Sequence, residues 1–138
     1  MSPVSRPRVL LVDDLETNRF LLEEALGEIG AEISSTGSGK RALELVSASH
    51  PEVVVIDFQM PDLSGAEAAR WIKQRADAPF TYVILMSGYH EEETELIRAS
   101  LADRFLGKPY KLSALRGAVE EGLRIASERR AVGSGLES

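Results

Sequence analysis

The fold can be inferred from one stretch in the middle of the sequence, Val53-Val54-Val55-Ile56-Asp57-Phe58-Gln59-Met60-Pro61. Four consecutive apolar β-formers lead directly into an acid, and Pro61 then ends the run. A short, uninterrupted run of this kind is typical of a strand covered on both faces, as in a parallel sheet. Asp57 would then lie at the carboxyl end of that strand, where open α/β sheets bind their ligands. We therefore interpret Asp57 as a nucleophile that the rest of the chain supports.

Strand patterns alternate with helix patterns five times along the chain. We expect strands over residues 8–12, 31–36, 53–57, 81–86 and 103–107, and helices over residues 17–29, 40–48, 64–75, 91–100 and 112–126. The strand over 31–36 is the most polar and is expected at an edge. In the first helix, the stripe expected to face the core comprises Phe20, Leu21, Ala25, Leu26 and Ile29. The alternation predicts an α/β fold: a five-stranded parallel sheet with helices on both faces, for which we adopt the flavodoxin-like, doubly wound order 2-1-3-4-5.

Length and composition favour one domain of a soluble, non-secreted protein. We expect a flexible leader over residues 1–7, a domain over 8–127, and a flexible tail over 128–138, where no apolar face continues. A net charge of −6 argues against a nucleic-acid contact, because phosphate binding needs a basic face. Cysteine is absent, which excludes disulfides and fits a reducing cytoplasm. No apolar run is long enough for membrane insertion, and no signal peptide is recognisable, so we expect a cytoplasmic location.

Polar residues follow the predicted strands at one edge of the sheet: Asp13, Asp14, Asp57, Ser87 and Lys108. Because the carboxyl ends of parallel strands share an edge, we expect these side chains to converge. Three crowded carboxylates are unfavourable unless a cation shares the site, and Mg²⁺ prefers such oxygen ligands. Aspartate is a known nucleophile in phosphoryl transfer, which needs mainly positioning and charge stabilisation. The set therefore predicts magnesium-assisted phosphorylation of an aspartate.

From about Arg8 to Ala126 the sequence resembles the receiver domain of two-component response regulators, of the chemotaxis-regulator type. The motifs that carry the resemblance are Val12-Asp13-Asp14, Asp57-Phe58-Gln59-Met60-Pro61 with Gly65, Ser87-Gly88 and Lys108-Pro109. The resemblance implies that Asp57 is the phosphoacceptor and that Ser87 and Lys108 assist the reaction. It also implies Mg²⁺, for which Mn²⁺ can substitute, held directly by Asp14 and Asp57, through water by Asp13, and by the backbone carbonyl of Gln59.

The same resemblance implies a conformational switch. Phe105 matches the aromatic residue whose rotamer reports phosphorylation, and Ser87 would move toward the new phosphoryl oxygens. Gln59 and Tyr89 match the two variable positions that tune the phosphoryl lifetime. The donor would be a sensor histidine kinase or a histidine phosphotransfer protein. A downstream protein would bind the face formed by the fourth helix, the fifth strand and the last helix. No enzyme activity beyond self-phosphorylation and autodephosphorylation is implied.

Several alternative interpretations of the sequence remain open. The chain is expected to be a single-domain response regulator without a DNA-binding output domain; alternatively, it is a receiver domain cut from a hybrid histidine kinase. A receiver used only for docking, without phosphorylation, is a further possibility. A phosphatase of the haloacid dehalogenase type would need a second acid where Gln59 stands. Flavin binding would need a phosphate cradle after the first strand, where Asp13-Asp14-Leu15-Glu16 is acidic.

Overall fold

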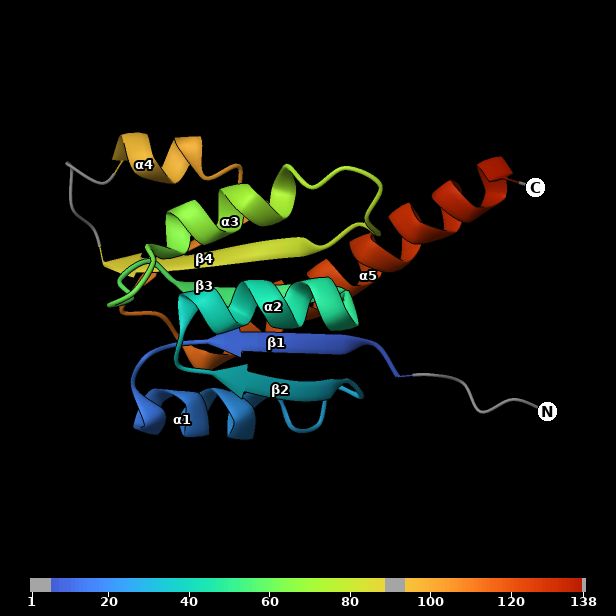
Figure 1. The fold of residues 1–138 in the computed structure, drawn as a ribbon. Helices are drawn as coiled ribbons and strands as arrows, with labels where there is room; N and C mark the ends of the chain where they lie inside the picture. The colour runs from blue at the N-terminus through green and yellow to red at the C-terminus, as the bar shows by residue number, and fades with distance from the viewer. Residues whose placement is uncertain (1–5, 89–93, 138) are drawn as a thin grey trace.

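The structure is a computed structural model that describes residues 6–88 and 94–137. Its five parallel strands form one sheet in the order β2-β1-β3-β4-β5, which confirms the predicted fold class (Figure 1). The strands are β1 (Arg8–Val12), β2 (Glu32–Thr36), β3 (Val53–Asp57), β4 (Tyr82–Gly88) and β5 (Arg104–Lys108). They alternate with the helices α1 (Glu16–Leu26), α2 (Gly39–Ser49), α3 (Gly65–Lys73), α4 (Thr94–Ala99) and α5 (Leu112–Glu137).

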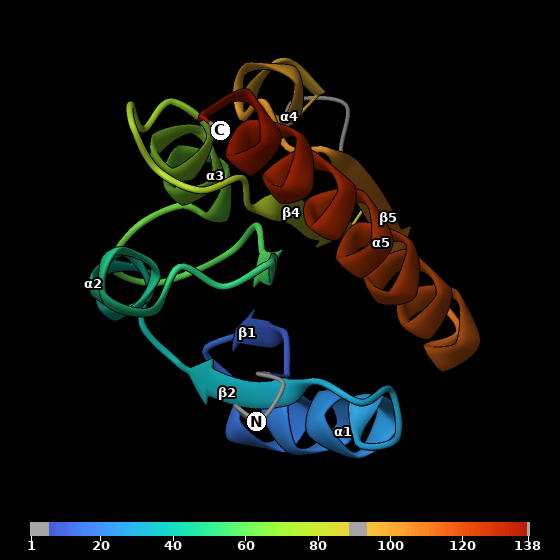
Figure 2. The same ribbon diagram turned by 90° about the vertical axis from the view of Figure 1, so that its right-hand side faces the viewer.

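Two apolar cores lie on opposite faces of the sheet. On one face, Leu26 of α1 and Leu115 of α5 pack against alternate residues of the central strands. On the other face, Val46 of α2 and Ile72 of α3 pack against the intervening strand residues. Figure 2 shows α2 and α3 on the side of the sheet opposite to α5. All five residues of β3 are buried, whereas β2 is half-exposed as predicted for an edge strand.

The apolar face of α1 differs from the prediction. Phe20 and Leu21 are 60% and 53% exposed, whereas Leu22, Ala25 and Leu26 are buried. Positions 22, 25 and 26 share one helical face at the spacing i, i+3, i+4, and that face covers the sheet. Ile29, beyond the end of α1, packs against the same core. Phe20 and Leu21 form a second apolar stripe that points away from it. Including these two residues in the core stripe was therefore wrong.

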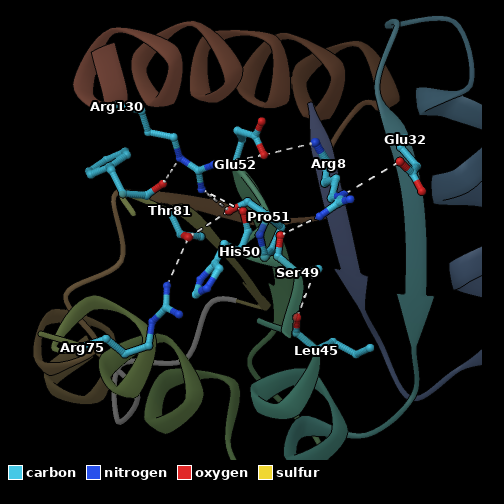
Figure 3. Close-up of polar contacts among 11 residues, drawn as sticks. Arg8, Glu32, Leu45, Ser49, His50, Pro51, Glu52, Arg75, Thr81 and Arg130 are labelled. Carbon is cyan, nitrogen blue, oxygen red and sulfur yellow. Dashed lines mark hydrogen bonds and ion pairs between the residues drawn. The ribbon is translucent and has the colours of Figure 1, made fainter. Parts of the chain in front are cut away.

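Helix α5 continues to Glu137, so the predicted end of the last helix at residue 126 was wrong. The physical reason is Arg130, whose guanidinium reaches the amino-terminal edge of the sheet (Figure 3). It donates hydrogen bonds to the carbonyls of Phe80 (2.8 Å), His50 (2.9 Å) and Pro51 (3.1 Å), and pairs with the Glu52 carboxylate at 3.4 Å. None of the helices in the described part of the chain has the length and apolar character of a membrane span.

Candidate functional site

Asp57 ends β3 at the carboxyl edge of the sheet, where it is 5% exposed. Lys108 is the last residue of β5, and its Nζ lies 2.6 Å from Asp57 Oδ2. The backbone N–H of Gln59 donates to Asp57 Oδ1 at 3.1 Å. The register of the sheet explains this meeting, since β4 lies between the two strands and pairs Asp57 with Met86 and Gly88 with Lys108. An ammonium group and an amide thus hold a buried carboxylate in a fixed orientation.

Asp13 is a second buried acid at this edge, with 1% of its surface exposed. Its Oδ1 accepts a hydrogen bond from the N–H of Leu15 at 2.9 Å, and its Oδ2 accepts one from Asn18 Nδ2 at 3.4 Å. Burial raises the pKa of the Asp13 carboxyl above its usual value, and the negative charge of Asp57 raises it further. The Leu15 hydrogen bond and the charge of Lys108 act in the opposite direction. The structure therefore brings Asp13, Asp57 and Lys108 together, as predicted.

Asp14 occupies a different place from the other two acids. It is exposed, and it lines a shallow depression of about 420 Å³ together with Phe58, Gln59, Met60, Pro61 and Ser64. Within residues 6–88 and 94–137, no three acidic or histidine side chains lie close enough together to hold a metal ion. The expected convergence of three carboxylates is therefore not seen: two acids meet around Lys108, and Asp14 stands at the rim beside Gln59.

The donor groups at this edge nevertheless fit a hard divalent cation. The carboxylates of Asp13, Asp14 and Asp57 and the carbonyl of Gln59 are all oxygen ligands, which Mg²⁺ prefers. The raised pKa of Asp13 shows that its charge is poorly compensated, since it results from burial and from the neighbouring charge of Asp57. An added positive charge at this point would relieve that repulsion.

The predicted switch residues lie on β4 and β5. Ser87 is 2% exposed, pairs with Gly107 across the sheet, and donates a hydrogen bond from its hydroxyl to the Gly88 carbonyl at 2.7 Å. Phe105 is 40% exposed on β5. Tyr89, which was predicted to tune the phosphoryl lifetime, lies outside the described residues.

Two further residues shape the site. Gly65 begins α3, and a Cβ atom there would lie 2.7 Å from the carbonyl carbon of Asp57 and 2.9 Å from Phe58 Cα, so only glycine permits this approach. Burial raises the pKa of the Tyr110 phenol, and the negative charges of Asp13 and Asp57 nearby raise it further. The sequence signal for Gly65 was its place in the motif, whereas Tyr110 was not predicted to be a site residue and carries no local signal of its place beside the acids.

Comparison with known proteins identifies the family. The response regulator receiver domain family matches residues 9–120. The regulatory protein AtoC of Escherichia coli is 34% identical over 127 residues, covering 91% of this chain and 27% of that protein. The polar-differentiation response regulator DivK of Brucella abortus is 30% identical over 102 residues, covering 73% of this chain and 83% of that protein.

A solved structure agrees with the sequence relatives. The signal receiver domain of a signal transduction histidine kinase from Syntrophus aciditrophicus has a TM-score of 0.80 and 27% identity, covering 86% of this chain and 90% of that one. The chain spans only about a quarter of AtoC and 13% of the autoinducer 1 sensor kinase/phosphatase LuxN of Vibrio harveyi. The activities of those longer proteins outside the matched region therefore do not transfer to this chain.

Proposed function

The chain belongs to the response regulator receiver domain family, and from this premise we propose that it is a signalling switch that accepts a phosphoryl group on Asp57. In this family the domain is a module of two-component signalling and not a conventional enzyme. The observation that carries the proposal is the contact of 2.6 Å between Lys108 Nζ and the buried carboxylate of Asp57. The donor is a phosphohistidine of a sensor kinase or a phosphotransfer protein: the phosphorus–oxygen bond to Asp57 forms as the phosphorus–nitrogen bond to the donor imidazole breaks.

Each neighbour of Asp57 has a role in this transfer. Lys108 offsets negative charge on the incoming phosphoryl group, and the Gln59 N–H orients the carboxylate that attacks. Ser87, at the end of β4, contacts a phosphoryl oxygen once its hydroxyl leaves the Gly88 carbonyl. Receiver domains of this family typically bind Mg²⁺, which would neutralise phosphoryl charge here. Asp13, Asp14, Asp57 and the carbonyl of Gln59 are the groups that would hold it.

The face that responds is the one formed by α4, β5 and α5. Three apolar side chains of these elements and the turn between them are exposed without phosphorylation: Leu96 on α4 (52%), Leu101 in the turn before β5 (48%) and Phe105 on β5 (40%). Phe105 lies on the same strand as Lys108, so a change at the phosphorylated carboxylate reaches it through β5. Repacking of Phe105 would bias this face between two arrangements, one of which a downstream protein binds.

The phosphodonor approaches over α1. Leu15 at the N-cap of this helix and Phe20 and Leu21 within it are each more than half exposed. Leu21 also lines a depression together with Lys108 and Tyr110. An apolar surface beside a polar reacting group suits a protein partner, because exposed apolar patches commonly mark interaction sites. Phe20→Lys should slow phosphorylation by a kinase but leave the reaction with acetyl phosphate unchanged. Equal slowing of both reactions would show that the helix supports the site and does not dock the donor.

Intact mass measurement tests the phosphoacceptor. The protein is incubated with Mg²⁺ and acetyl phosphate, and the wild type should gain one phosphoryl group that alkaline hydroxylamine removes. Asp57→Asn should gain none, whereas the control Asp77→Asn, which alters an exposed acid outside the site, should behave as the wild type. A phosphoryl group on Asp57→Asn, or none on the wild type, would contradict the proposal.

A further inference from the structure

Asp62 connects two parts of the chain that are distant in sequence. Its carboxylate accepts hydrogen bonds from the Ser38 hydroxyl at 2.6 Å and from the N–H groups of Gly39 and Lys40 at 3.0 and 3.1 Å. These donors form the first turn of α2, where free N–H groups and the helix dipole favour a negative charge. Asp62 therefore caps a helix from the loop that follows Asp57, although it is not part of that helix.

The hydrogen bonds of Asp62 hold its side chain charged. The Ser38 hydroxyl above all, and then the Lys40 and Gly39 amides, lower the pKa of the carboxyl far below its usual range. The first turn of α2 and the loop also touch directly, since a Cβ atom at Gly39 would lie 3.0 Å from both the Cβ and the carbonyl oxygen of Leu63. The loop and the helix are thus packed together as well as hydrogen-bonded.

The loop that Asp62 anchors is the one that forms a wall of the proposed site. Its two ends are fixed near Asp57, by the Gln59 N–H on Asp57 Oδ1 and by the Gly65 N–H on the Phe58 carbonyl at 2.8 Å. Between these ends, residues 60–63 make no hydrogen bond to another element of the described chain except through Asp62. The same loop lines the depression beside Asp14 and carries the backbone carbonyl of Gln59.

We propose that Asp62 is a positioning residue for the chemistry at Asp57: by capping α2 it holds the 58–64 loop, and with it the Gln59 backbone, in the orientation that the metal and the phosphoryl group require. This inference rests on the proposed function. Asp62 touches neither the acids nor Lys108, so its effect passes through the loop. Without the cap, the loop between its two fixed ends would sample other conformations, and the Gln59 carbonyl would spend less time facing the site.

Three variants test the inference. Asp62→Ala removes the cap, and Asp62→Asn keeps one acceptor oxygen for the α2 amides. Val46→Ala removes buried volume from the carboxyl-terminal half of α2 and keeps every hydrogen bond of Asp62. Calorimetry measures Mg²⁺ affinity, acetyl phosphate gives the phosphorylation rate, and amide hydrogen exchange in metal-free protein reports on the Gln59 N–H. We expect Asp62→Ala to weaken Mg²⁺ binding by at least about threefold and to speed exchange at Gln59, with a smaller effect for Asp62→Asn. Val46→Ala should lower the melting temperature but leave both quantities unchanged.

The outcomes separate this inference from the proposed function. If Asp62→Ala lowers the melting temperature while its Mg²⁺ affinity and Gln59 exchange match those of Val46→Ala, Asp62 is only a helix cap and the inference is wrong. If the wild type neither binds Mg²⁺ nor gains a phosphoryl group, the proposed function fails. In that case the exchange measurement still decides whether Asp62 anchors the loop.

Discussion

Replacing Lys108 by methionine gives the most direct measure of what holds the Asp57 carboxylate in its buried place. The two side chains meet at 2.6 Å, and that of Asp57 is 8% exposed while that of Lys108 is 35% exposed. Methionine keeps most of the length of the side chain but removes its charge. Breaking a fully buried ion pair by removing one partner costs about 3–5 kcal/mol. Because water reaches part of Lys108, we expect a smaller loss of about 2–3 kcal/mol in the free energy of unfolding.

The assay is urea unfolding followed by circular dichroism at neutral pH, first without metal and then with Mg²⁺. Lys111→Met is the matched control, because it makes the same change at an exposed lysine, and it should alter stability by less than about 0.5 kcal/mol. Mg²⁺ bound to the native state should reduce the difference in unfolding free energy between Lys108→Met and the wild type, since the added cation compensates the charge of the same carboxylate. Equal unfolding free energies for the two variants would refute the reasoning, as would a gap that Mg²⁺ leaves unchanged.

Three other perturbations follow from the structure. Arg130→Met should destabilise the protein by about 2 kcal/mol or more in thermal unfolding, because it leaves three carbonyls and Glu52 without their cation. The control Arg124→Met breaks only an exposed ion pair and should cost less than about 1 kcal/mol. Asp13→Asn should stabilise the metal-free protein at neutral pH. The pKa of Asp13 is higher in the folded state, so the folded protein keeps this proton to a higher pH than the unfolded chain does. The contribution of Asp13 to stability therefore falls as the pH rises from 3.8 through its folded pKa. If Asp13→Asn shows the same pH profile of unfolding as the wild type, this prediction is wrong. Gly65→Ala should displace the start of α3 from Asp57. The free energy of unfolding should fall by about 1–3 kcal/mol, and phosphorylation by acetyl phosphate should become slower. An unchanged unfolding free energy and an unchanged phosphorylation rate would show that α3 can shift without cost.

The sheet and the meeting of Asp57 with Lys108 were predictable from local patterns. An uninterrupted apolar run marks a central strand whatever surrounds it, and parallel strands necessarily bring their carboxyl ends to one edge. Asp13 was placed correctly by the same argument. The end of a strand fixes where a residue lies but not the direction of its side chain. The strand pattern therefore could not show that Asp14 is exposed at the rim while Asp13 is buried.

The remaining differences come from contacts between distant residues. In α1 two apolar stripes overlap, and only packing against the sheet decides that Leu22 is buried and Phe20 is exposed. The length of α5 depends on Arg130, whose partners lie at residues 50–52 and 80. The cap that Asp62 provides has no local signature, because the helix that it caps lies more than twenty residues earlier. Periodicity and capping rules describe neighbours in sequence and could not predict any of these three.

The contacts of Arg130 have a consequence for how the molecule opens. The carbonyls that it binds lie immediately before β3, the central strand of the sheet, and before its neighbour β4. The last turns of α5 and the beginnings of these strands should therefore unfold as one cooperative unit. Trypsin, which cuts after arginine, would then cleave at Arg130 only in molecules whose sheet has already opened at that edge, and its rate would follow the population of that open state.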